Sequence, residues 1–74
     1  MSKYYEVSFY DGKTSQGRTV KAESAEKAIW YVEQRAKGYY GDVKAYAREI
    51  SEGEARKYEK RGRKILTFEP GTER

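Results

Sequence analysis

The densest group of chemically active side chains is the segment ARKYEKRGRK, residues 55–64. Within residues 56–64, six cations stand against one acid, Glu59, whereas the whole chain carries a net charge of only +4. Lys and Arg at this density can neutralise phosphates, or an acidic protein surface, and displace counterions. The candidate contacts with nucleic acid or a partner protein are Arg56, Lys57, Lys60, Arg61, Arg63 and Lys64.

An alternative for this segment is an ordinary solvated helix face. Glu59 lies four residues before Arg63, and Glu52 four before Arg56, which are spacings of helical ion pairs. Cations near a helix end also compensate its dipole. The cations left over repel one another unless an external anion neutralises them. Four of the six share spacings of three and four and are the expected phosphate contacts: Lys57, Lys60, Arg61 and Lys64.

The chain lacks the residues that most enzymes use. It contains no His and no Cys, which removes the usual general base, the thiolate nucleophile and the commonest soft metal ligands. Asp11-Gly12 is typical of a turn. Gly-Lys-Thr at residues 12–14 lacks the first glycine of a phosphate-binding loop and precedes a strand instead of a helix. The sequence therefore predicts a non-catalytic binding protein without metal or cofactor.

Length and composition predict one small domain, residues 1–74, near the lower size limit for a single core. Eight Tyr, two Phe and one Trp supply apolar area in place of disulfides. Charges of both signs are interspersed over most of the chain, as in folded soluble domains. The sequence has no apolar run of membrane length and no secretory leader, so we expect a cytoplasmic protein without a membrane partner.

The elements that must position the basic segment follow from hydrophobic periodicity. YEVSFY, residues 5–10, alternates and predicts a half-buried strand, and RTVKAE, residues 18–23, predicts a second strand after a turn. Setting Val7 opposite Val20 also sets Glu6 opposite Lys21, an attractive cross-strand pair. We expect the hairpin to adopt this register.

The main helix is predicted at residues 24–38, SAEKAIWYVEQRAKG. Ser24 is its expected N-cap, and Gly38 stands where a left-handed residue ends a helix. Trp30 and Tyr31 flank the stripe that we expect to face the sheet. That stripe consists of Ala25, Ala28, Ile29, Val32 and Ala36.

Three further elements complete the chain: a strand in residues 42–50, a short helix at about residues 52–61 ending at Gly62, and a strand in residues 64–70 closed by Pro70. SEGE, residues 51–54, is a capping box in front of the short helix. The predicted order is β-β-α-β-α-β. The predicted class is α+β, with an antiparallel sheet and one main helix packed on one face.

The sheet face away from the main helix mixes aromatic residues with cations, which is typical of surfaces that stack bases and bind phosphates. Alternatively, the tyrosines shelter the sheet from water, or the second helix covers them with Tyr58. The two tyrosines within residues 38–41 are either a partner anchor or part of a helix cap. The candidate residues on the sheet face are Tyr4, Tyr10, Lys21, Lys44, Tyr46 and Arg48.

The passage from hairpin to helix has the pattern V-x-A-x-S-x-E-x-A, formed by Val20, Ala22, Ser24, Glu26 and Ala28. Through it, residues 4–45 resemble the small DpnD/PcfM-like proteins of phages and mobile elements. The basic segment lies outside this resemblance. The resemblance implies the context of an accessory gene and no defined activity.

Two function classes follow. In the first, the chain binds DNA or RNA, with the basic segment on phosphates and the tyrosines on bases or sugars. In the second, a phage or mobile-element protein binds and inhibits a host protein, such as a defence nuclease. Mimicry of DNA is excluded, because a mimic must be acidic.

Overall fold

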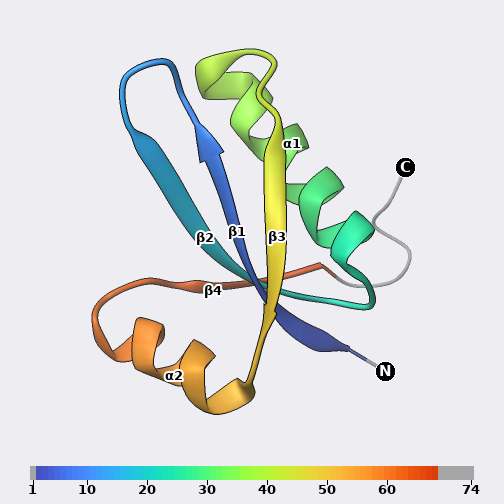
Figure 1. The fold of residues 1–74 in the computed structure, drawn as a ribbon, viewed down its shortest axis with the longest axis vertical. Helices are drawn as coiled ribbons and strands as arrows, with labels where there is room; N and C mark the ends of the chain where they lie inside the picture. Colours follow the sequence, from blue (N-terminus) through green and yellow to red (C-terminus); the bar gives the residue numbers. More distant parts are fainter. Residues whose placement is uncertain (1, 69–74) are drawn as a thin grey trace.

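The structure is a computed structural model in which residues 2–68 are described. Its elements are β1 (Lys3–Tyr10), β2 (Ser15–Ala22), α1 (Ala25–Tyr40), β3 (Ala45–Ile50), α2 (Glu52–Lys60) and β4 (Ile65–Thr67). The predicted order and the α+β class are confirmed. Figure 1 shows α1 along the sheet and α2 near the end where β3 finishes. The predicted strand end at Pro70 lies outside the described residues.

The four strands form one sheet in the order β3-β1-β2-β4. β1 pairs antiparallel with both β2 and β3, as predicted, but β4 pairs parallel to β2. The sheet is therefore mixed. The reason is that β3 and β4 lie at opposite edges, so the chain must cross the sheet through α2, and such a crossover permits parallel pairing.

The β1–β2 register differs from the predicted one by two residues. Glu6 lies opposite Thr19 instead of Lys21, and Val20 lies opposite Tyr5. A shift of two keeps every side chain on its own face, so the apolar alternation is equally satisfied by either register. The turn between the strands decides between them.

That turn is organised by Asp11. Its carboxylate accepts hydrogen bonds from the backbone N–H groups of Lys13 and Thr14, both at 2.8 Å, and from the Gln16 side chain at 2.8 Å. Gly12, with φ 98°, supplies the left-handed residue. The bonds from Thr14, then Lys13, then Gln16 lower the pKa of Asp11 to about 2. This compact turn sets the start of β2 and hence its register.

α1 runs further than predicted. It continues through Gly38 to Tyr40, and the left-handed residue that follows it is Gly41, with φ 80°. The Tyr40 ring packs on Phe9 with centroids 5.7 Å apart, and this contact favours the extra helical residues beyond Gly38. Ser24 is the N-cap, as predicted, since its hydroxyl accepts a backbone hydrogen bond from the first turn.

The core lies between α1 and the sheet. Phe68 closes one end of it and packs on Trp30 and Tyr31, with ring centroids 5.6 and 5.2 Å away. Ile29 is only half-buried beside this core. The buried members are Tyr5, Val7, Phe9, Val20, Ala22, Ala28, Val32, Ala36, Ala45 and Phe68.

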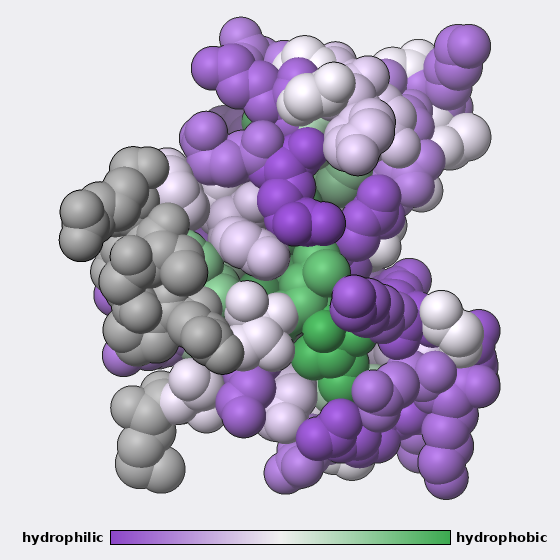
Figure 2. All heavy atoms as spheres, turned by 180° about the vertical axis from the view of Figure 1, so that it is seen from behind, coloured by the Kyte–Doolittle hydropathy of each residue, from purple (hydrophilic) through white to green (hydrophobic). Residues whose placement is uncertain are grey.

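The face of the molecule shown in Figure 2 is mostly hydrophilic. Figure 2, which shows the molecule from behind, has charged and polar residues around most of its outline and a narrow apolar strip near the middle. Within residues 2–68, no helix is both long enough and apolar enough to cross a membrane.

Candidate nucleic-acid interface

The basic segment is part of the fold, because both ends of α2 are capped. The Ser51 hydroxyl accepts a hydrogen bond from the Glu54 N–H at 3.1 Å. The return bond of the predicted capping box is absent among the described residues, since the Glu54 carboxylate accepts from Arg48 at 3.3 Å and from the Tyr58 hydroxyl at 3.2 Å. Ala55 is fully buried against the sheet side.

The C-terminal end of α2 is a Schellman motif. Gly62, with φ 99°, donates its N–H to the Glu59 carbonyl at 3.0 Å, and Arg63 donates to the Tyr58 carbonyl at 3.1 Å. The backbone of the basic segment is therefore a helix end and a tight turn. This turn directs Arg63 back toward the sheet.

Arg63 interacts with other side chains of the fold. It donates to the Glu6 carboxylate at 2.6 and 2.8 Å, and its guanidinium lies 4.9 Å from the Tyr58 ring centroid. The predicted Glu59–Arg63 pair is wrong because the turn at Gly62 takes Arg63 off the helical surface. Glu59 instead accepts from Arg56 at 3.1 Å.

Arg56 also interacts with other side chains of the fold. It also pairs with Glu52 at 3.5 Å, as the spacing predicted, and its guanidinium lies 5.9 Å from the Tyr4 ring centroid. The hydrogen bond to Glu59, and then the proximity of Tyr4, raise the pKa of Arg56. Two of the six cations thus hold α2 in place.

The other four cations point to the solvent. All are exposed, and within residues 2–68 none of them forms an ion pair with an acidic side chain. Two of them line an open hollow of about 520 Å³ beside Tyr58. These cations, the α2 cation cluster, are Lys57, Lys60, Arg61 and Lys64.

α2 covers one end of the candidate sheet face. Tyr4 is half-buried there, between Arg56 and Lys21, whose ammonium lies 5.7 Å from the ring centroid. Arg48 pairs with Glu54 of α2. Tyr4, Lys21 and Arg48 therefore contribute to the contact with α2 or lie at its border. The alternative that the second helix covers these aromatics holds for this end only.

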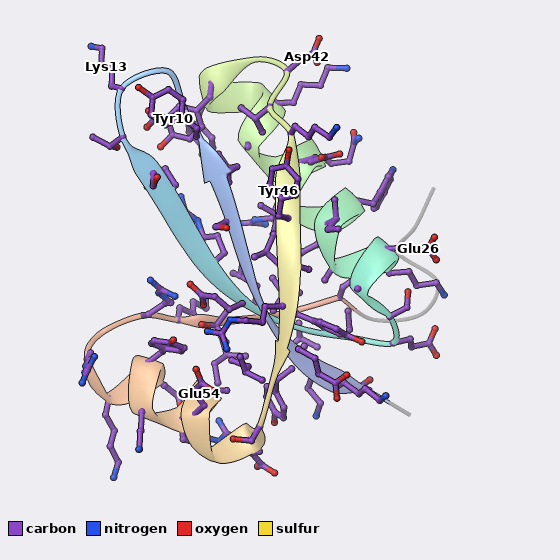
Figure 3. The ribbon with its side chains drawn as sticks, viewed as in Figure 1. Tyr10, Lys13, Glu26, Asp42, Tyr46 and Glu54 are labelled. Carbon is purple, nitrogen blue, oxygen red and sulfur yellow. The ribbon has the colours of Figure 1, made fainter. Side chains whose placement is uncertain are left out.

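The other end of the same face is open. Tyr10 and Tyr46 are 61% and 63% exposed, and Lys44 lies 6.0 Å from the Tyr46 ring centroid. These residues line a hollow of about 380 Å³ together with Ser8 and Ser15. In Figure 3 the two labelled tyrosines lie in the upper half of the sheet, far from Glu54 on α2.

Sequence reasoning missed the residues that hold the interface together. Glu6 was assigned no role toward the basic segment, although it accepts from Arg63, and Glu54 was expected only in the capping box, although it accepts from Arg48 of β3. Ser8 and Ser15 of the open hollow were also missed. No sequence signal indicated the Glu6–Arg63 pair, because the predicted register gave Glu6 a partner in Lys21, whereas the observed register sets Glu6 opposite Thr19.

In the part of the chain that the structure describes, no group of three or more acidic side chains could hold a metal ion. No protein-family model, curated protein or solved structure matches the chain. The DpnD/PcfM-like resemblance of residues 4–45 thus stays a prediction.

Proposed function

We propose that this chain is a non-catalytic, cytoplasmic nucleic-acid-binding module that contacts phosphates through the α2 cation cluster. The observation that carries the proposal is the contrast among the six cations. Arg56 and Arg63 have acidic partners, whereas Lys57, Lys60, Arg61 and Lys64 have none among residues 2–68.

Unpartnered cations at one place repel one another, and a polyanion removes this repulsion. Each phosphate that they neutralise also releases counterions, which favours binding most strongly at low salt. The capped ends of α2 hold the backbone of the cluster before any ligand arrives. Binding then restricts only the side chains. Because the backbone is already ordered, less conformational entropy is lost on binding, and this favours a higher affinity.

The test replaces Lys57, Lys60, Arg61 and Lys64 together by Gln and measures affinity for arbitrary single-stranded and duplex DNA over a range of salt. If all four contact phosphates, the slope of log K against log salt flattens by about three to four units. Folding should survive, because these side chains are exposed. A melting curve checks this.

A matched control removes the same charge elsewhere. The variant with Lys3, Lys13, Arg35 and Lys37 replaced by Gln has an equal net charge but keeps the α2 cation cluster. It should retain most of the affinity and nearly all of the salt slope. If both quadruple variants bind like the parent, the cluster is not the contact surface.

The same cluster also fits an acidic protein surface. If the parent binds neither duplex nor single strands at moderate salt, the proposal fails. The phage or mobile-element inhibitor of a host protein, such as a defence nuclease, then becomes the leading function.

A further inference from the structure

The open end of the sheet face differs from the end under α2 in having aromatic rings that no element covers. We propose that Tyr10, Tyr46 and Lys44 form a stacking site for unpaired bases, so that the chain binds single-stranded nucleic acid in preference to duplex. This inference rests on the proposed function and names the substrate class of the same interface.

The strand register places both rings on one surface. Tyr46 of β3 lies opposite Ser8 of β1, and Tyr10 follows two residues along β1. The two tyrosines are therefore diagonal neighbours, about 7–8 Å apart at the backbone. Tyr10 and Tyr46 are 61% and 63% exposed, so a base can reach part of each ring.

The charge of this surface suits a nucleic-acid backbone. Arg63 neutralises Glu6, and the Asp11 carboxylate, which keeps its charge, accepts hydrogen bonds from three donors within its own turn. Lys44 has no acidic partner among the described residues and lies beside the Tyr46 ring. It can neutralise a phosphate next to a base stacked on that ring.

α2, which carries most of the α2 cation cluster, packs on the sheet face that bears the two tyrosines, since Arg56 and Arg63 contact Tyr4 and Glu6 on that face. Figure 3 shows α2 at one end of the sheet and the two labelled tyrosines toward the other. A flexible single strand can follow this side and present its bases to the rings. The bases of a duplex are stacked on one another and cannot do so. Duplex binding therefore uses the cations alone, whereas single strands gain the stacking as well.

The test compares the parent with the double variant Tyr10→Ala/Tyr46→Ala at one fixed salt concentration. The probes are oligothymidylate and oligouridylate of about 16 nucleotides, the upper size for one small domain, and a DNA duplex of the same length. Loss of stacking on both rings should weaken single-strand binding at least tenfold. Duplex affinity should change by less than about twofold.

Two controls separate stacking from other effects. The variant Tyr10→Phe/Tyr46→Phe keeps both rings and should retain single-strand affinity. Tyr39→Ala removes a tyrosine that is 86% exposed at the end of α1, away from this hollow, and should leave all affinities unchanged. Lys44→Gln should weaken single-strand binding and reduce its salt slope by about 0.7 units.

Each outcome separates this inference from the proposed function. If the parent binds single strands and duplex equally, or if the alanine variant loses both equally, the single-strand preference is overturned while the phosphate contacts stand. If the alanine variant binds single strands as the parent does, the stacking site is overturned. If the parent binds no nucleic acid, the proposed function fails.

Discussion

The Arg63 guanidinium donates two hydrogen bonds to the Glu6 carboxylate, at 2.6 and 2.8 Å, and so joins the loop after α2 to the middle of β1. The two side chains are 33% and 19% exposed. Partial burial reduces solvent screening, and Tyr58 covers the guanidinium on one side. This pair is the main polar attachment between the binding segment and the sheet.

Removing one partner of this pair should be costly. Glu6→Ala leaves a half-buried guanidinium without its acceptor, and we expect a loss of about 1–2 kcal/mol in the free energy of unfolding. Urea denaturation of Glu6→Ala, Arg63→Ala and the double variant measures it. The double variant should be less destabilised than the sum of the single variants, by about 1 kcal/mol. Simple additivity would mean that the pair contributes no coupling.

Gly17 makes room for the same pair. A Cβ at this position would lie 2.9 Å from Glu6 Oε2 and 3.0 Å from Arg63 Nη2. Gly17→Ala should therefore displace the two charged groups and cost about 1 kcal/mol of stability. Gly53→Ala in α2 is the control, since its Cβ would meet only Ser51 Oγ at 3.8 Å and should slightly stabilise the helix. Equal effects in the two variants would contradict this account.

The hydroxyl of Thr19 is buried without a hydrogen-bond partner among the described residues. Replacing it by the methyl of Val removes the cost of desolvating an unpaired polar group. Thr19→Val should therefore stabilise the fold by about 1 kcal/mol, seen as a higher thermal midpoint. Thr67→Val, at an exposed strand position, should change stability by less than about 0.5 kcal/mol. A destabilised Thr19→Val variant would show that the hydroxyl has a partner.

The turn at Asp11 makes the stability of the fold depend on pH in the acidic range. Its folded pKa of about 2 lies below its ordinary value of 3.8, so folding favours the carboxylate. The resulting stability is fully present above the ordinary pKa and is lost as the pH falls from about 4 through about 2. Thermal midpoints of the parent and Asp11→Asn should differ by a constant amount at neutral pH and converge below pH 2. If the two thermal midpoints differed by the same amount at every pH, the charge of Asp11 would not be the cause of the difference.

Local patterns are enough to predict the elements of this fold and three of the four members of the α2 cation cluster. Alternation identifies β1 and β3, and the serines at positions 24 and 51 begin the helices because both can accept a first-turn N–H. Helical spacing accounts for Lys57, Lys60 and Arg61, which occupy α2 or its cap, but not for Lys64, which lies beyond the turn at Gly62.

The side-chain hydrogen bonds of one turn and interactions between distant segments account for what alternation and helical spacing cannot predict. The hairpin register depends on the turn of Asp11, and the end of α1 depends on the contact of Tyr40 with Phe9. The role of Arg63 depends on Glu6, far away along the chain. Helical spacing offered Glu59 as a nearer partner, but the turn at Gly62 separates the two side chains.

The parallel pairing of β4 with β2 has a consequence for the order in which the chain folds. It joins Thr19 with Ile65, whereas the β1–β2 hairpin closes over a short turn. Long loops close at a greater entropic cost, and distant contacts form slowly. We expect the hairpin to form first and β4 to be added last. Until then the free edge of β2 can pair with another chain, so refolding at high protein concentration should favour aggregation.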